Sequence, residues 1–147
     1  MSRLAATLVA TILRTASACA CDEWQSPPWM LRGIAAVETR SFQDPYGVWF
    51  YVDKRRGTSG ERGMMQVTLD AFRIARRLIP ESRYTFAQLD SPMVSIATAH
   101  AYLYYLRSHA GSWDEAIMAY NVGLRGLLVN RQRGLDYLER VKAAGSR

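Results

Sequence analysis

Prolines and small polar residues divide this sequence into segments whose apolar residues recur at helical spacing. Ser26 is followed by two prolines, which predicts a helix with Ser26 as its N-cap and proline in its first turn. This helix is expected to run to about Glu38. A second helix is predicted over 68–79, where Pro80 ends the pattern, and a third over 91–108, with glycine just beyond it. The chain is therefore expected to be mainly helical.

Two more helices are predicted in the C-terminal third. Ser112 and Glu115 form a capping box, which opens a helix that carries Tyr120 and Asn121. A last amphipathic helix is indicated by the apolar residues Leu135, Leu138 and Val141.

A short β-hairpin interrupts the helical pattern. Residues 46–53 alternate in the manner of a strand, and the run ends in a stretch rich in arginine and glycine. Residues 64–67 are expected to pair back as the second strand, in a hairpin too small to form a core sheet. The predicted fold class is α+β, predominantly helical, with one small hairpin.

Length and composition indicate a single globular domain. A chain of 147 residues buries one core, and 49% hydrophobic against 22% charged residues excludes disordered and collagen-like classes. Nineteen Lys and Arg against thirteen Asp and Glu give a surface that attracts polyanions. Because these basic residues are scattered, we interpret them as a solvated face and predict no nucleic-acid partner.

The first 23 residues permit two interpretations. A basic residue, an apolar run over 4–13 and small residues after it are typical of a secretory signal peptide, here residues 1–18. A polar stripe that continues to Arg14 instead favours a helix of the folded protein. The apolar run is too short to cross a bilayer, so no transmembrane span is predicted. The globular domain is placed at 24–147.

Cysteine and histidine are too few for a disulfide framework or a metal site. Cys19 and Cys21 are separated by one residue, and His100 and His109 lie nine positions apart, which is not the spacing of a helical ligand pair. No metal ion and no cofactor is predicted.

Glu38 is an acid at the end of an otherwise apolar helical stripe. Burying a carboxylate is costly unless it is paired or protonated. In one interpretation Glu38 bends out to water or pairs with Arg40 or Arg62. In the other, burial raises its pKa so that it can donate a proton near neutral pH. Helix spacing alone leaves both open.

Three separated segments occur in a characteristic order. They are Ile-Ala-Ala-Val-Glu-Thr-Arg-Ser-Phe at 34–42, Ser-Gly-Glu-Arg-Gly-Met-Met-Gln-Val-Thr at 59–68 and Ala-Ile-Met-Ala-Tyr-Asn-Val-Gly at 116–123. A weaker fourth is Tyr-Leu-Glu-Arg-Val at 137–141. Together they resemble the soluble lytic transglycosylase family, with its catalytic helix ending in Glu-Ser, its Gly-Leu-Met-Gln and Ala-Tyr-Asn-x-Gly motifs and its tyrosine-containing final helix. The resemblance covers roughly residues 24–144.

This resemblance implies a goose-type lysozyme-like fold and cleavage of peptidoglycan between N-acetylmuramic acid and N-acetylglucosamine. In the family one Glu protonates the β-1,4 bond and then deprotonates the muramoyl C6 hydroxyl, which leaves a 1,6-anhydro end. Glu38 matches that residue. The positions that match substrate-binding residues are Thr39, Met65, Gln66, Tyr120, Asn121 and Tyr137. The mechanism requires no second carboxylate, metal or cofactor.

Two departures from the family pattern limit this transfer. Thr39 stands where the family usually has Ser, which keeps a hydroxyl beside the acid. Glu38 and Gly63 are 25 positions apart, longer than usual, and the strand at 46–53 accounts for the extra length. The aromatic residues of this strand could stack on sugars, but hairpin packing is favoured.

The Gln66 amide needs a hydrogen-bond partner, which a sugar hydroxyl or acetamido group would supply.

Two alternatives stay open at this level. A goose-type lysozyme would hydrolyse the same bond with water held by further carboxylates, for which Asp44 and Asp53 are the nearby candidates. A wall-binding component of a phage particle or of a secretion or conjugation machine would keep the fold without turnover. Small stand-alone domains of this type resemble proteins from all these settings. Peptidoglycan strands are the expected partner, in the periplasm, at the cell wall or on a virion.

Overall fold

The computed structural model describes residues 24–80 and 83–147. The expected N-terminal helix or signal-like segment falls on residues 1–23 and lies outside the described residues, as do both cysteines. The described part contains five α-helices, one 3-10 helix and a two-stranded antiparallel sheet. The predicted class, α+β and predominantly helical with a small hairpin, is confirmed.

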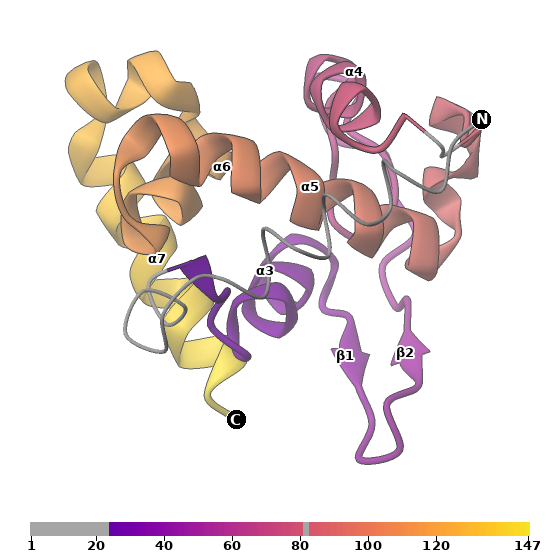
Figure 1. The fold of residues 1–147 in the computed structure, drawn as a ribbon. Helices are drawn as coiled ribbons and strands as arrows, with labels where there is room; N and C mark the ends of the chain where they lie inside the picture. Colours follow the sequence, from indigo (N-terminus) through magenta and orange to yellow (C-terminus); the bar gives the residue numbers. More distant parts are fainter. Residues whose placement is uncertain (1–23, 81–82) are drawn as a thin grey trace, which may run out of the picture.

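The packing of the elements does not follow their order in the chain. That order is α3 (Met30–Thr39), β1 (Phe42–Gln43), β2 (Trp49–Phe50), α4 (Leu69–Leu78), the 3-10 helix η1 (Phe86–Asp90), α5 (Pro92–Ala110), α6 (Trp113–Val129) and α7 (Arg131–Gly145). Helix α3 packs against α7, α7 against α6, α6 against α5, and α5 against α4. In Figure 1 helices α3 and α7, the first and last described helices of the chain, lie side by side, and the hairpin projects from the helical body.

Apolar side chains from every helix meet in one core. Helix α4 has only ten residues, so its stability depends on packing rather than on helix propensity. Each large apolar side chain that is fully buried contributes roughly 1.5–3 kcal/mol. Fully buried examples are Met30, Ile34, Leu89, Leu103, Ile117, Tyr137 and Val141. No described helix has both the length and the hydropathy needed to cross a bilayer.

Several helix ends lie where capping residues predict them. Thr68 Oγ1 accepts a hydrogen bond from the Ala71 N–H at 3.1 Å, and Ser112 Oγ accepts one from the Glu115 N–H at 3.1 Å. Helix α5 has its proline in the first turn and ends at Gly111. The predictions over 68–79 and 91–108, and the start of the helix after Ser112, are confirmed.

The start of α3 differs from the prediction. Ser26 does not cap the helix; Trp29 is the N-cap residue and Met30 the first helical one. The reason is the pair of prolines, because the second keeps the residue before it extended and delays the helix. The Met30 N–H donates to the Pro27 carbonyl at 3.0 Å, which closes a turn before the helix. Ser26 Oγ instead lies 3.1 Å from His100 Nε2.

The hairpin is present, but its partner strand is not the predicted one. Residues 49–50 pair with 42–43, upstream, and Phe42 lies opposite Phe50. The predicted second strand, 64–67, is part of a tight turn in the core, joined only by an isolated bridge from Arg62 to Val67. A five-residue turn connects the two observed strands. Pairing of 49–50 with 64–67 would close a longer loop, which costs more conformational entropy.

Gly123 divides α6 into two helical segments. Its φ of 75° and ψ of 165° are not helical, and such a φ is readily adopted only by glycine. The break follows directly after Tyr120 and Asn121, where the sequence contains a helix-stop signal. The helix then resumes and continues to Val129.

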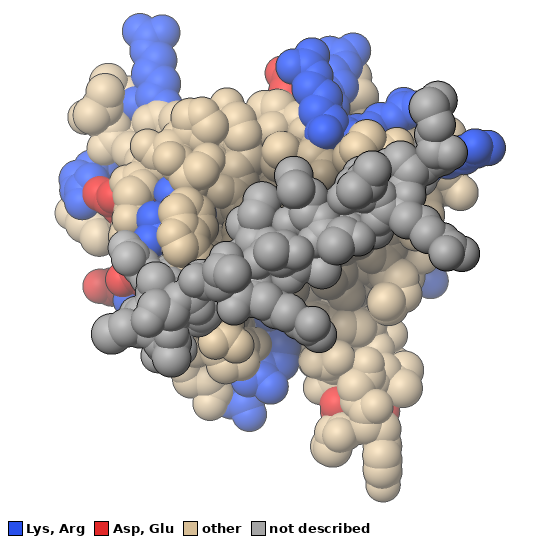
Figure 2. All heavy atoms as spheres, in the orientation of Figure 1, with Lys and Arg blue, Asp and Glu red and all other residues tan. Residues whose placement is uncertain are grey.

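Basic residues are dispersed over the described surface. Figure 2 shows Lys and Arg at several separate places on the face in view. Several of them pair with acids, such as Arg62 with Asp90 and Lys142 with Asp114.

Gly33 sets the separation of α3 and α7. A Cβ at this position would lie 2.2 Å from the Val141 carbonyl oxygen and 2.8 Å from Val141 Cγ1. Because the oxygen belongs to helix backbone, it cannot move aside as a side chain can.

We predict that Gly33→Ala lowers the free energy of unfolding by about 1–3 kcal/mol, because the added methyl forces the two helices apart. Chemical denaturation would measure the change. Gly134→Ala is the matched control, since the three atoms nearest to a Cβ there belong to the Met118 side chain, at 3.1 to 3.5 Å, and no backbone oxygen lies closer. Equal stabilities of the two variants would contradict the close approach.

Candidate active site

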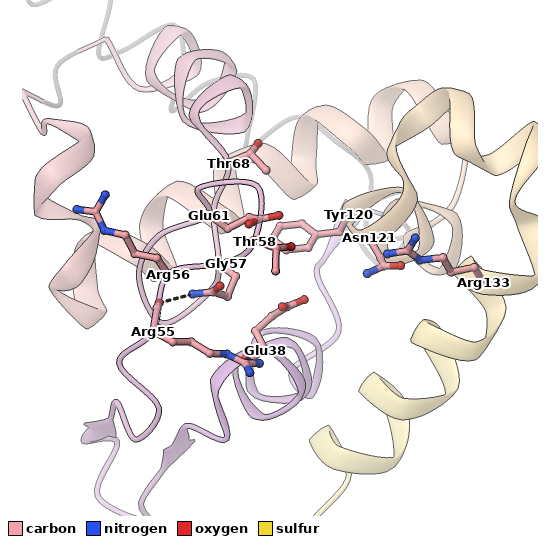
Figure 3. A pocket seen from close by; sticks show the side chains of 11 residues that line it. Glu38, Arg55, Arg56, Gly57, Thr58, Glu61, Thr68, Tyr120, Asn121 and Arg133 are labelled. Carbon is pink, nitrogen blue, oxygen red and sulfur yellow. Dashed lines mark hydrogen bonds between the residues drawn. The ribbon is translucent and has the colours of Figure 1, made fainter.

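One pocket contains the carboxyl of Glu38. Its volume is about 350 Å³, within the usual range of small-molecule sites. Figure 3 shows Glu38 extending from α3 toward Tyr120 and Asn121, while the loop after β2 forms another wall. The lining residues are Glu38, Arg55, Arg56, Gly57, Thr58, Glu61, Gln66, Thr68, Tyr120, Asn121 and Arg133.

The Glu38 side chain is bound by a residue of the C-terminal helix. It lies in the last turn of α3, and Tyr137 Oη of α7 donates a hydrogen bond to Glu38 Oε1 at 2.6 Å. Burial raises the pKa of the Glu38 carboxyl because the charged form loses hydration, and the Tyr137 hydrogen bond opposes part of this rise. The net result is a pKa above the ordinary value for Glu. Such a carboxyl keeps its proton to higher pH than an exposed one.

Both arginines considered as partners for Glu38 pair elsewhere. Arg40 lies 3.7 Å from Asp53, and Arg62 donates two hydrogen bonds to Asp90. The interpretation of Glu38 as a surface acid paired with either of them therefore does not hold.

Charged neighbours act on the Glu38 carboxyl in both directions. The positive charges of Arg140 and Arg55 lower its pKa, and the negative charge of Glu61 raises it. Arg55 is fixed because its Nη2 donates to the Glu38 carbonyl oxygen at 2.9 Å. Arg140 lies against the Tyr137 ring, 5.6 Å from its centroid. The two cations therefore favour the carboxylate once its proton has left.

Tyr137 is buried and Tyr120 partly buried, and both are neutral phenols. Burial, and then the neighbouring Glu38, raise the pKa of each hydroxyl well above its ordinary value, so each remains a hydrogen-bond donor. Tyr120 Oη donates to the Met65 carbonyl at 2.7 Å. Tyr120 thereby connects α6 to the turn at 63–67 while it lines the pocket.

The turn at 63–67 is held by its neighbours. Gln66 has a φ of 49°, a left-handed conformation that is uncommon for a residue with a side chain. Its Nε2 donates to the carbonyls of Gly63 at 3.0 Å and Arg55 at 3.1 Å. The partners of this amide nitrogen are therefore main-chain carbonyls, where a sugar was expected. Gln66 nevertheless lines the pocket.

Thr39 and Met65 lie beneath the pocket, fully buried, and are not among its lining residues. Thr39 Oγ1 donates to the Met64 carbonyl at 2.8 Å and lies 2.7 Å from Ser41 Oγ. The Met65 N–H donates to Ser95 Oγ at 3.0 Å. The first contact connects the end of α3 to the turn and the last connects the turn to α5, which gives both residues a positioning function.

Asn121 has a buried side-chain oxygen for which no hydrogen-bond partner exists among the described residues. Leaving a buried acceptor unpaired costs about 1–3 kcal/mol. Because Asn121 lines the pocket, an N–H or O–H group of a bound ligand could satisfy this oxygen.

A second pocket, of about 290 Å³, extends the first. It shares Gln66, Tyr120 and Asn121 with it and reaches Tyr102 and Gly123. The two pockets therefore adjoin each other at these three residues.

The wall formed by residues 55–61 was not foreseen from the sequence, nor was Arg133 of α7. Glu61 belongs to this wall, and its Oε2 accepts a hydrogen bond from the Ser59 N–H at 2.9 Å. Gly57 leaves room for the Glu61 carboxyl, since a Cβ there would lie 2.0 Å from Oε2. The only sequence signal was the Gly- and Ser-containing run, which indicated a turn.

The two acids considered for the hydrolytic alternative lie outside the pocket. Asp44 accepts hydrogen bonds from two backbone N–H groups of the hairpin turn, and Asp53 lies 3.7 and 3.6 Å from two arginines. Glu61 is the acid that lines the pocket together with Glu38. Within 24–80 and 83–147, no three His, Cys, Asp or Glu side chains are grouped to hold a metal ion.

Comparison with known proteins gives one match. The family model described as the transglycosylase SLT domain matches residues 16–137. Neither the curated proteins nor the solved structures that were searched contain a match to this chain. The matched segment includes Glu38, the turn at 63–67, Tyr120 and Tyr137. Since it spans most of the sequence, the chain belongs to the transglycosylase SLT domain family, peptidoglycan enzymes of lysozyme-like fold that cleave glycosidic bonds.

Proposed function

We propose that this protein is a lytic transglycosylase that cleaves the β-1,4 bond between N-acetylmuramic acid and N-acetylglucosamine and leaves a 1,6-anhydro end. Glu38 acts first as general acid and then as general base. The observation that carries this proposal is the Glu38 carboxyl itself, which is partly buried, bonded to Tyr137 and open to a pocket.

In the first step Glu38 transfers its proton to the glycosidic oxygen as the bond to C1 breaks. The acid must be protonated near neutral pH, and burial of Glu38 favours that state. Positive charge then develops at C1 and the ring oxygen of the muramoyl sugar. The carboxylate formed beside it is stabilised by Tyr137, Arg55 and Arg140.

In the second step the muramoyl C6 hydroxyl attacks C1 and gives its proton to Glu38. The carboxyl returns to its starting state, so one residue completes the cycle without metal or cofactor. Both states of Glu38 have support: burial favours the protonated form, and the Tyr137 hydroxyl and two cations favour the carboxylate.

Asn121 supplies the best-supported substrate contact. Its side chain lines the pocket, and its buried oxygen has no hydrogen-bond partner among the described residues, so a turn of the amide would let this oxygen accept a hydrogen bond from an acetamido N–H or a sugar hydroxyl. Gln66 and Tyr120 form neighbouring parts of the lining, while Thr39, Met65 and Tyr137 act by positioning these groups and Glu38.

Hydrolysis is the second candidate reaction, because Glu61 lines the same pocket as Glu38. A carboxylate there could hold an attacking water, as a goose-type lysozyme requires. Mass spectrometry of the released muropeptides separates the reactions: 1,6-anhydro ends support transglycosylation, and reducing ends support hydrolysis. A protein that binds sacculi and releases no fragments would be a wall-binding component instead.

We also propose that the protein acts in the periplasm or at the cell wall, where peptidoglycan is found, as part of a phage, secretion or conjugation system. N-terminal sequencing of the native protein tests the targeting part of this proposal. Loss of residues 1–18 would identify a signal peptide, and their retention would contradict one.

Glu38→Gln is expected to slow sacculus digestion by about 10²–10⁴-fold, since an amide cannot donate or accept the proton. Release of soluble muropeptides would measure the rate. Glu139→Gln, which changes an exposed acid of α7, is the matched control and should digest sacculi like the wild type. Unchanged digestion by Glu38→Gln would disprove the assignment.

The pH profile should respond in opposite directions to two neighbours of Glu38. Cleavage needs the protonated acid, so kcat/KM falls as pH rises through the pKa of Glu38. Tyr137→Phe removes a hydrogen bond that lowers this pKa, so the fall should move to higher pH. Glu61→Gln removes a charge that raises it, so the fall should move to lower pH. Exposed Asp136→Asn is the control, and displacement of both profiles in one direction would refute this account.

Asn121→Leu should raise KM about ten-fold through loss of one hydrogen bond to substrate, with little loss of stability. Stability is retained because the Asn121 oxygen has no protein partner among the described residues. Thr39→Val is the comparison. The Thr39 hydroxyl is paired with a carbonyl, so this variant should lose about 1–2 kcal/mol of folding free energy. Substrate titration and thermal unfolding measure the two effects. An unfolding temperature of Asn121→Leu well below that of the wild type would contradict the assignment.

A further inference from the structure

The hairpin that projects beside the active-site wall has two apolar faces. Trp49 and Tyr51 are half-buried and pack against the core. The opposite face consists of apolar side chains that are 44 to 52% exposed, namely Phe42, Val48, Phe50 and Val52. Antiparallel strands at a surface normally alternate apolar and polar residues, so this face requires an explanation. We call these four residues the outer face.

The outer face continues to the tip of the hairpin, where Tyr46 is 93% exposed. The Phe42 and Phe50 rings stack on each other with centroids 5.0 Å apart. In Figure 2 the projecting hairpin is almost entirely uncharged. Between residues 41 and 52 the sequence contains one charged side chain, Asp44.

The turn at the tip satisfies its own backbone. Asp44 Oδ1 accepts hydrogen bonds from the N–H groups of Tyr46 at 2.9 Å and Val48 at 2.8 Å. The Asp44 N–H donates to the Val48 carbonyl, and the Gly47 N–H donates to the Asp44 carbonyl. Pro45 has no N–H. Every backbone donor from 44 to 48 is therefore paired within the turn, as a segment that leaves water must arrange.

Positive charge lies at the base of the same hairpin. Arg40 precedes it, and Lys54, Arg55 and Arg56 follow it, all four of them exposed. Asp53 offsets part of this charge through Arg40 and Arg55. An apolar, aromatic tip above a basic base is complementary to a membrane surface that carries anionic headgroups.

We propose that the hairpin is a membrane-docking element, whose outer face and Tyr46 enter the interface of an anionic lipid bilayer while the basic residues at its base contact the headgroups. A sugar polymer fits this face less well, because the outer face offers no polar side chain to bind hydroxyls. This inference does not depend on the proposed reaction.

Co-sedimentation with vesicles tests the proposal. Wild-type protein should pellet with equimolar phosphatidylglycerol and phosphatidylcholine and less with phosphatidylcholine alone. Tyr46→Ser/Val48→Thr, at the tip, should lower the partition coefficient by about ten-fold or more. Leu128→Ser/Val129→Thr is the matched control, because this apolar pair is also exposed and ends α6, far from the hairpin in Figure 1. The control should bind like the wild type.

Wild-type protein that stays in the supernatant would overturn the proposal and leave the outer face to a protein partner. An equal fall of the partition coefficient in the tip and control variants would also overturn the proposal. Should the tip variant fail to fold, as circular dichroism would reveal, Val48→Trp decides, because an added interfacial aromatic should strengthen binding. No gain would also overturn the proposal. Sacculus digestion is measured separately, so failure of the proposed reaction leaves the vesicle result unaffected.

Discussion

The hydrogen bond between Tyr137 and Glu38 is the contact on which the rest of this structure depends. It joins residues 99 positions apart and forms only because α3 packs against α7. Gly33 permits that packing, since a side chain there would collide with the Val141 carbonyl. The acid is consequently held, partly buried, at a fixed place, with a raised pKa and a donor already directed at it. A carboxyl in that state can both give and accept a proton.

A second set of contacts holds the surface that faces Glu38. Thr39 is bonded to the carbonyl of Met64, Tyr120 to that of Met65, and the Gln66 amide to two further carbonyls. Residues of three separate segments thus support one tight turn. Since each is buried or bonded to backbone, the loss of one contact is expected to disturb the geometry of the pocket as well as its stability. Asn121 is the exception, because its side chain lines the pocket and its oxygen has no partner among the described residues.

The segment between Glu38 and Gly63 combines two different surfaces. Its second half, residues 55–61, forms a charged wall of the pocket, in which Glu61 and Arg55 act on the pKa of Glu38 in opposite directions. Its first half is a hairpin whose outer face is apolar and exposed. This one segment therefore contributes to the chemistry of the acid and, under our proposal, to attachment of the protein to a membrane. Because the two halves are continuous, a hairpin held at a membrane would place the pocket close to that surface.

The sequence by itself determined the helices with strong end signals, such as those opened by Thr68 and Ser112, because capping is a local interaction. It also identified Glu38 and the motifs around it, through residue types whose order along the chain is characteristic. Only the tertiary structure decided that Phe42 pairs with Phe50, that Gln66 binds main-chain carbonyls, and that Glu61 shares the pocket with Glu38. Those outcomes depend on which distant groups come within hydrogen-bond reach. Helix packing decides which of these groups are close in space, and the periodicity of a sequence does not reveal how its helices pack.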